Sequence, residues 1–131
     1  MRKGDLVFVY GTLRPGMGAN GYMTGGAEHR GQSQISAYMY NAGWYPGVKL
    51  ATEDGQFVTE GPKVVGDLYE ITDERLPSLL DSYEGYPNLY DRAEVETACG
   101  RKAWVYTYNP ITYDDQLIPS GDWSTTRHVE A

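Results

Sequence analysis

The stretch VFVYGTLRPG, residues 7–16, carries the strongest pattern in this sequence. Together with Leu6 it forms a continuous apolar run that Gly11 ends. A run of this kind, rich in β-branched residues and bounded by glycine, predicts a buried first strand that leads directly into a turn. Because glycine has no side chain, N–H groups around Gly11 can face a ligand, and consecutive N–H groups bind anions. We therefore expect a carboxylate-binding loop here, although a glycine after a strand often does no more than permit the turn.

Further strands are expected along the rest of the chain. Residues 11–31 are rich in glycine and predict a loop with one helical turn near residues 20–24. Strand-like composition then recurs at residues 35–40, 48–50, 64–71, 90–97 and 103–108. Residues 53–63 predict a hairpin or a surface loop, and residues 98–102 predict the tight turn between the last two strands.

One helix is expected between these strands. Apolar residues recur at helical spacing from Leu76 to Tyr83, and Thr72 or Asp73 precedes them as a candidate cap. No internal repeat and no linker divides the chain. The order of elements predicts a single α+β domain over residues 1–131, with a curled or barrel-like sheet.

Composition and charge exclude several classes of partner. Eighteen acidic residues against eleven basic ones give a net charge of −7, which opposes binding to nucleic acid or to an anionic membrane surface. The apolar run at residues 6–10 is too short for a signal peptide or a membrane span. Cys99 is the single cysteine, so no intramolecular disulfide can form. We expect a cytoplasmic protein that acts on a small molecule, and the sequence leaves its oligomeric state unknown.

The polar residues offer few alternatives for chemistry. His29 and His128 have no Cys, His, Asp or Glu at ligand spacing nearby, which predicts that no metal is bound. Arg14 could pair with a substrate carboxylate, but an arginine in a loop is more often simply exposed. The twelve tyrosines fit either a strand-rich core with polar tips or a pocket for a polar small molecule.

Three segments resemble one protein family in order along the chain. VFVYGTLRPG, VVGDLYEI at residues 64–71 and LDSYEGYPNLYDRAEV at residues 80–95 are similar to the gamma-glutamylcyclotransferase and AIG2-like superfamily. In that family a Y-G-[ST]-L element follows the first strand. The resemblance spans nearly the whole chain and also includes Tyr45 and Pro46. It implies a small mixed β-barrel-like fold with a few short helices.

The resemblance also implies which residues form the site. The glutamyl end of the substrate would lie against the backbone of Tyr10, Gly11, Thr12 and Leu13. Glu84 matches the position of the family's catalytic glutamate, although on its own it would be taken for an ordinary carboxylate at a helix end.

Two further residues recur at matching positions in relatives. Tyr90 would line the pocket, whereas Arg92 is expected to support the fold by pairing with a carboxylate.

The implied reaction converts a gamma-glutamyl amine into 5-oxoproline and a free amine, without a cofactor. The α-amino nitrogen loses a proton as it attacks the γ-carbonyl, and the leaving amine gains one. One carboxylate can perform both transfers, which contributes on the order of 10²- to 10⁴-fold. We expect Tyr83, Tyr86 and Leu89 to raise the pKa of Glu84 toward neutrality. The identity of the amine is left open.

The alternative is a non-catalytic module that keeps the same fold and pocket and binds or sequesters a small molecule. Such a module would need the loop but not the carboxylate of Glu84, which would repel an anionic ligand. The presence of both features favours an enzyme.

Overall fold

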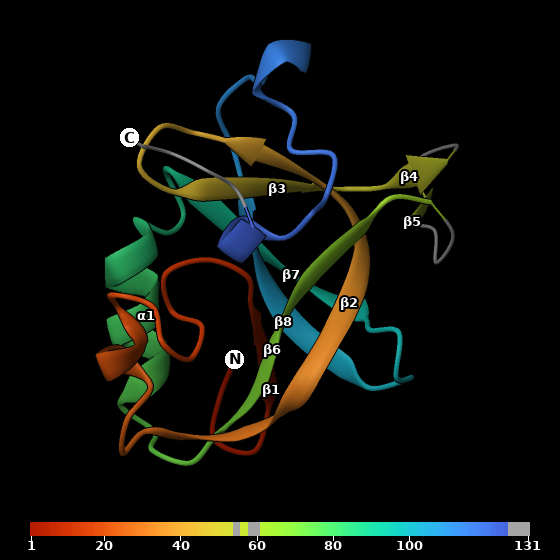
Figure 1. The fold of residues 1–131 in the computed structure, drawn as a ribbon. Coiled ribbons are helices and arrows are strands. Elements are labelled where there is room, and N and C mark those ends of the chain that lie inside the picture. Colours follow the sequence, from red (N-terminus) through yellow and green to blue (C-terminus); the bar gives the residue numbers. More distant parts are fainter. Residues whose placement is uncertain (54–55, 58–60, 126–131) are drawn as a thin grey trace.

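The computed structural model describes residues 1–53, 56–57 and 61–125 and contains one large curved sheet (Figure 1). Its elements are β1 (Leu6–Val9), η1 (Asn20–Tyr22), β2 (Ala27–Asn41), β3 (Pro46–Leu50), β4 (Thr52–Glu53), β5 (Gln56–Phe57), β6 (Lys63–Ile71), α1 (Leu76–Glu84), β7 (Tyr90–Glu96), β8 (Lys102–Tyr108), η2 (Asp114–Gln116) and η3 (Trp123–Thr125). The large sheet has the order β3-β2-β6-β1-β8-β7, and β4 pairs with β5 separately. Only β1 and β8 run parallel within the described sheet, which therefore has the mixed, curled architecture that the sequence predicts.

The large sheet curls until β3 reaches β8. In Figure 1, β2 bends across the other strands, and α1 lies to one side. Gly47 of β3 lies against Tyr108 of β8, where an added Cβ would be 2.5 Å from Tyr108 Cγ. Lys49 Nζ also donates a hydrogen bond to the Tyr108 carbonyl oxygen at 2.9 Å. Because a glycine stands at the point of contact, the two strands can approach closely, and β3 at one edge of the sheet meets β8 near the other edge.

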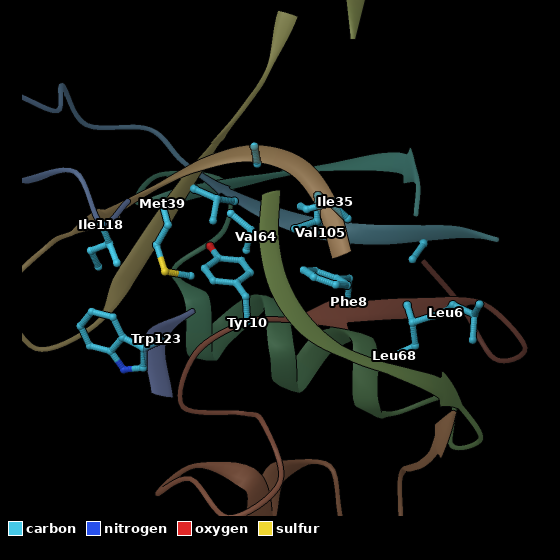
Figure 2. Packing of buried hydrophobic residues seen from close by; sticks show 13 residues of the cluster. Leu6, Phe8, Tyr10, Ile35, Met39, Val64, Leu68, Val105, Ile118 and Trp123 are labelled. Atoms are coloured by element: carbon cyan, nitrogen blue, oxygen red, sulfur yellow. The ribbon is translucent and has the colours of Figure 1, made fainter. Parts of the chain in front are cut away.

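The central strand β1, which lies between β6 and β8, is buried on both faces because its residues pack into a hydrophobic cluster on each side of the sheet. Leu6 and Phe8 point into the cluster inside the curled sheet, together with Tyr10 just beyond the strand (Figure 2). Val7 and Val9 point to the opposite side and pack in the cluster that includes α1. This burial on both faces explains the unbroken apolar run in the sequence.

The helix α1 covers the second cluster and stops abruptly. Leu76 and Leu80 are its fully buried residues. Gly85 follows the last helical residue, Glu84, with φ 70° and ψ 35°, a left-handed conformation that favours glycine. The glycine therefore fixes the point at which the helix ends and where the side chain of Glu84 is presented.

Two expectations from the sequence are wrong. Arg75 occupies the N-cap position of α1 without a side-chain cap, and Asp73 instead accepts a hydrogen bond from the Arg75 N–H at 2.9 Å. Thr72 does not cap the helix either. The strand expected at residues 35–40 begins at Ala27, because β2 pairs with β6 on both sides of a register shift between His29 and Gln32.

Other expectations are confirmed. The helical turn near residues 20–24, the helix and the final hairpin lie where the sequence predicts them. The expected hairpin at residues 53–63 corresponds in part to β4 and β5, while residues 54–55 and 58–60 lie outside the described residues. No helix within the described ranges is both long and apolar enough to cross a membrane.

Candidate active site

A cavity of about 230 Å³ lies where the end of β1, the start of β3 and the end of α1 meet. All six residues that the sequence analysis assigns to the site line it, namely Tyr10, Gly11, Thr12, Leu13, Glu84 and Tyr90. The remaining walls come from Phe8, Val9, Tyr45, Pro46, Tyr83, Leu89 and Tyr106. The structure thus brings together residues as far apart in the chain as Phe8 and Tyr106.

The residues 10–13, named here the cradle loop, line the cavity and include backbone N–H groups without a hydrogen-bond partner in the described part of the chain. The loop is held by hydrogen bonds from the Arg14 N–H to the Gly11 carbonyl oxygen at 3.1 Å and from the Ala19 N–H to the Thr12 carbonyl oxygen at 2.9 Å. Both bonds use carbonyl groups of the loop. Within the described residues no hydrogen bond uses the N–H of Gly11, Thr12 or Leu13. These donors remain available for an anionic or carbonyl group of a ligand.

The space at position 11 is too small for any residue with a side chain. A Cβ added there would lie 2.8 Å from Pro46 Cγ and 3.0 Å from Pro46 Cδ. The proline ring is rigid and begins β3, so a larger residue would push the cradle loop away from the opposite wall. The close approach of the loop and β3 therefore depends on the glycine that ends the apolar run.

Glu84 is the ionisable carboxyl group in the cavity wall. It is partly buried at the last position of α1, and burial raises its pKa to about 7. Within the described part of the chain its carboxylate has no ion pair and no hydrogen bond. Tyr83 and Leu89 lie in the same wall, as the sequence analysis expects of neighbours that raise this pKa. Tyr86 instead lies under Arg92, whose guanidinium carbon is 4.3 Å from the ring centroid.

The buried tyrosines at the cavity use their hydroxyl groups to hold the walls together. Tyr10 donates to the Tyr106 carbonyl oxygen at 2.7 Å, and Tyr90 donates to the Pro46 carbonyl oxygen at 2.7 Å. Burial and the nearby Glu84 carboxylate raise the pKa of both tyrosines, so their hydroxyls stay protonated. Tyr90 thus lines the cavity, while its hydroxyl joins β7 to β3.

Asp81 fixes the last turn of α1 to the sheet. Arg92 Nη1 lies 2.7 Å from Asp81 Oδ1 and 2.6 Å from Asp81 Oδ2, and the Tyr106 hydroxyl donates to Oδ1 at 2.7 Å. Arg92 therefore pairs with a carboxylate outside the cavity lining, as the sequence analysis expects. The pair holds the segment that carries Glu84.

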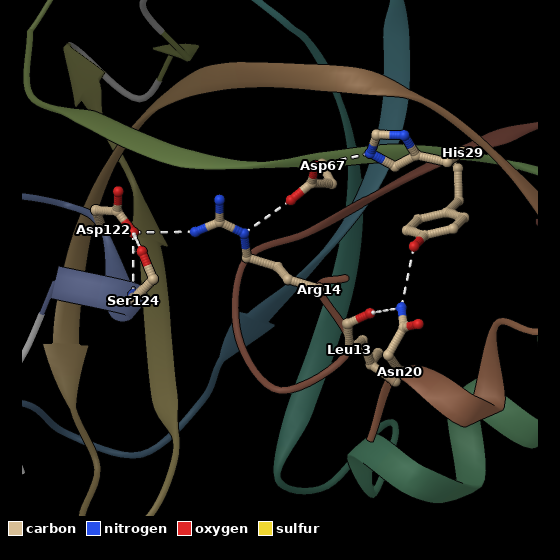
Figure 3. Close-up of polar contacts among 8 residues, drawn as sticks. Leu13, Arg14, Asn20, His29, Asp67, Asp122 and Ser124 are labelled. Atoms are coloured by element: carbon tan, nitrogen blue, oxygen red, sulfur yellow. Dashed lines mark hydrogen bonds and ion pairs between the residues drawn. The ribbon is translucent and has the colours of Figure 1, made fainter. Parts of the chain in front are cut away.

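Arg14 lies in a buried ionic network and does not line the cavity (Figure 3). Its Nε is 2.8 Å from Asp67 Oδ2, and its Nη1 is 3.0 Å from Asp122 Oδ1. His29 Nε2 lies 2.8 Å from the other Asp67 oxygen. The expectation of an exposed loop arginine is wrong, because β6 and the segment after β8 supply carboxylates that accompany the guanidinium into the interior. Arg14 anchors the cradle loop.

Sequence reasoning did not single out Tyr45, Tyr106 and Pro46 as cavity residues. Tyr45 and Pro46 belong to a segment that contributes to the family resemblance, and this resemblance is the sequence signal that could have indicated them. Tyr106 carries no local signal, because it becomes a wall residue only through the pairing of β8 with β1. Among the residues that the structure describes, no group of three or more His, Cys, Asp or Glu side chains could hold a metal ion.

Comparisons with known proteins agree on one family. The model of the family described as "Gamma-glutamyl cyclotransferase, AIG2-like" matches residues 7–125. A Vibrio cholerae serotype O1 protein named as a candidate gamma-glutamylcyclotransferase is 36% identical over 121 residues, which cover 90% of this chain and 94% of that protein. The gamma-L-glutamyl-butirosin B gamma-glutamyl cyclotransferase of Niallia circulans is 31% identical over 130 residues, covering 92% and 76% of the two chains.

A solved structure has the same fold. The crystal structure of an uncharacterized protein from Pyrococcus horikoshii superimposes with a TM-score of 0.70 at 26% identity, covering 92% of this chain and 90% of the other. The family match includes the cradle loop, the end of α1 and every strand of the large sheet except the first residue of β1. The chain belongs to the gamma-glutamyl cyclotransferase, AIG2-like family.

Proposed function

We propose that this chain is an active cyclotransferase that converts a gamma-glutamyl amine into 5-oxoproline and a free amine, with Glu84 as the general acid and base. The observation that carries the proposal is the position of Glu84. An unpaired carboxyl group with a pKa of about 7 lines the same cavity as the free N–H groups of the cradle loop. Catalytic groups with a pKa near the working pH are the most effective in both directions of proton transfer.

The proposed reaction begins with the substrate folded so that its α-amino nitrogen faces its own γ-carbonyl carbon. A new C–N bond closes the five-membered ring, and Glu84 accepts the proton that the attacking nitrogen loses. The bond from the γ-carbonyl carbon to the leaving nitrogen then breaks, and Glu84 returns the proton to that nitrogen. The products are 5-oxoproline and the free amine, and the carboxylate of Glu84 is regenerated.

The cradle loop would hold the glutamyl end of the substrate during these steps. Its N–H groups can donate hydrogen bonds to the α-carboxylate, and fixing that end favours the folded conformation in which nucleophile and electrophile meet. Tyr10 and Tyr90 would act indirectly, since their hydrogen bonds to neighbouring strands keep the walls in place.

The test compares the wild-type protein with Glu84→Gln and with Glu74→Gln, an exposed residue ahead of α1 that does not line the cavity. Each protein is incubated with a panel of gamma-glutamyl amines, and 5-oxoproline is followed by mass spectrometry. We expect Glu84→Gln to lose on the order of 10²- to 10⁴-fold in kcat/KM, because the positioned proton transfer is removed. Glu74→Gln should keep the wild-type rate.

The alternative of a non-catalytic binding module predicts a different result. It would bind gamma-glutamyl compounds, measured by calorimetry, without releasing 5-oxoproline from any donor. Equal rates for the wild type and Glu84→Gln, in proteins with matching circular dichroism spectra, would instead remove Glu84 from the mechanism.

A further inference from the structure

We propose that Asn20 is a positioning residue of the site, which holds the cradle loop in the orientation that binds the glutamyl end of the substrate. The side-chain amide of Asn20 contacts the loop and the large sheet at the same time, although Asn20 does not line the cavity. This inference rests on the proposed function, and it adds a residue that acts on the substrate through the loop.

Asn20 joins the cradle loop to β6. Its Nδ2 donates a hydrogen bond to the Leu13 carbonyl oxygen at 2.8 Å and another to the Tyr69 hydroxyl oxygen at 3.0 Å (Figure 3). A carbonyl oxygen can only accept a hydrogen bond, so the nitrogen of the amide, and not its oxygen, must face Leu13. Both protons of this nitrogen are then used, which fixes the orientation of the side chain.

Tyr69 is itself held in place on β6. Its side chain lies on the same face of the strand as that of Asp67, two residues earlier, which pairs with Arg14. His29 of β2 contacts both of them: its ring centroid is 5.2 Å from that of Tyr69, and its Nε2 is 2.8 Å from Asp67 Oδ1. Leu13, through Asn20, and Arg14 are therefore attached to alternate residues of one strand.

The bond to Leu13 affects the free donors of the loop through successive peptide groups. In a planar trans peptide, the carbonyl and the following N–H point in opposite directions. The peptide group with the Leu13 carbonyl carries the Arg14 N–H, which donates to the Gly11 carbonyl oxygen at 3.1 Å. The peptide group with the Gly11 carbonyl carries the Thr12 N–H, which has no hydrogen-bond partner in the described part of the chain. Asn20 thus fixes the direction of this donor through two peptide groups.

The peptide group between these two is held by the residue before Asn20. The Ala19 N–H donates to the Thr12 carbonyl oxygen at 2.9 Å, and the same peptide group carries the unpaired N–H of Leu13. One short segment at the start of η1 therefore binds two successive carbonyls of the loop. A carboxylate that meets donors already held in this way loses less free energy to ordering them when it binds.

The experiment tests whether Asn20 acts on the part of the substrate that the loop would hold. One donor is a gamma-glutamyl amine, and the other is the matching 4-aminobutanoyl amine, which lacks only the α-carboxylate and cyclises to 2-pyrrolidinone. The ratio of kcat/KM for the two donors is named here the carboxylate preference. We expect Asn20→Leu to reduce this preference by about 10-fold, the factor that one hydrogen bond to a charged group contributes. A purely structural role would slow both donors equally.

Two further measurements distinguish positioning from general damage to the site. For the gamma-glutamyl donor, the loss in Asn20→Leu should appear mainly as a higher KM, because the carboxylate is bound both before and during the reaction. The pH midpoint of kcat/KM should remain that of the wild type, since the change leaves Glu84 and α1 unaltered.

Tyr69→Phe tests the attachment to β6. It removes the hydroxyl and leaves the bond from Asn20 to Leu13, so it should lower the carboxylate preference by only about 2- to 3-fold. In the double variant with Asn20→Leu it should lower the preference no further, because the hydroxyl acts on the loop through Asn20. Tyr69→Phe also keeps the proposal testable if Asn20→Leu does not fold: an unchanged preference in Tyr69→Phe then counts against it.

Asn109→Leu is the matched control. The amide of Asn109 also donates to two acceptors, the carbonyl oxygens of Pro87 and Asn88, but this residue is exposed and does not line the cavity. Its replacement should leave the carboxylate preference unchanged. If the 4-aminobutanoyl donor reacts too slowly, competitive inhibition by an N-alkyl glutaramate and by the matching N-alkyl butanamide measures the same preference without turnover.

The outcomes separate the two proposals. An equal loss for both donors in Asn20→Leu, or an equal loss of preference in Asn109→Leu, overturns the positioning role while leaving the cyclotransferase intact. The absence of 5-oxoproline from every gamma-glutamyl donor overturns the proposed function, and this inference with it.

Discussion

Asp67 and Glu84 are two carboxylates that are both shielded from solvent, but to different degrees and with different partners. The Asp67 side chain is 5% exposed, and Arg14 and His29 contact its two oxygens (Figure 3). Glu84 is partly buried and has no charged partner in the described part of the chain, so its pKa rises to about 7. Burial alone therefore does not determine how a carboxylate behaves; the supply of cations and donors around it does.

Asp67 therefore supports the fold, whereas Glu84 is available for the proposed proton transfers. Arg14, which follows the cradle loop in the chain, pairs with Asp67 and so anchors the loop to β6. The cavity itself is left without a basic residue among its described lining. A carboxylate in such a place can gain and lose a proton near neutral pH.

Removing the partner of Asp67 should produce the largest change in stability. Arg14→Ala leaves the buried carboxylate of Asp67 with the partly exposed His29 as its remaining side-chain partner among the described residues, and breaking a buried pair of this kind costs about 3–5 kcal/mol. Urea unfolding at pH 7 measures the loss. The matched control is Arg75→Ala, which breaks an exposed pair with Asp73 and should cost less than about 1 kcal/mol. Equal costs for the two variants would contradict the comparison.

Removing the charge of Glu84 should instead increase the stability of the folded protein. The folded pKa of about 7 lies above the ordinary value of 4.5, so folding favours the protonated form, and stability is lost as the pH rises through 7. The full shift corresponds to about 3 kcal/mol, reduced to about 1–3 kcal/mol because the side chain is only partly buried.

Glu84→Gln cannot ionise, so it should be more stable than the wild type by that amount at pH 8 and equal to it near pH 4. The free energy of unfolding at several pH values tests this, with Glu74→Gln as the variant that should show no such trend. A constant difference between Glu84→Gln and the wild type from pH 4 to pH 8 would indicate that Glu84 titrates normally.

The same titration should appear in the rate. If ionised Glu84 is the base, kcat/KM should fall on the acidic side with a midpoint near pH 7, about 10-fold for each pH unit below it. A midpoint near 4.5 would mean that the carboxylate is solvated in the free enzyme. Measurements with a donor whose own groups do not titrate between pH 5 and pH 8 avoid confusion with the substrate.

The smallest effect is expected at the rim of the cavity. Thr12→Val removes the hydroxyl that meets Tyr83, a hydrogen bond between exposed groups worth about 0.5–1.5 kcal/mol or less. Thermal unfolding should therefore change little, while KM for the donors should rise because the cradle loop and α1 lose a link. An unchanged KM would show that this contact does not order the cavity.

The sequence predicts the parts of the molecule that depend on local pattern. The apolar run of β1, the periodicity of α1 and the turn between β7 and β8 are visible without the fold. The first residues of β2 are not, because Ala27 to Gln32 is polar and contains Gly31 with φ 105°. This segment becomes a strand only by pairing with β6, which follows it by more than thirty residues.

The residues of the site also divide into those that the sequence predicts and those that it does not. The cradle loop and Glu84 could be identified because the family resemblance covers contiguous residues. Arg14 was misjudged because its partners, Asp67 and Asp122, lie 53 and 108 positions away, and no local pattern reveals a pair at that separation. The contact between the rings of Tyr22 and Tyr83 joins η1 to the end of α1, and the sequence alone does not indicate it.

The ion pair between Arg14 and Asp122 has a mechanical consequence. Asp122 lies beyond β8, in a segment attached to the sheet by hydrogen bonds such as that from the Val65 N–H to the Gly121 carbonyl oxygen at 2.8 Å. A pulling force applied to this segment would therefore reach the cradle loop through Arg14 as well as the large sheet through Val65.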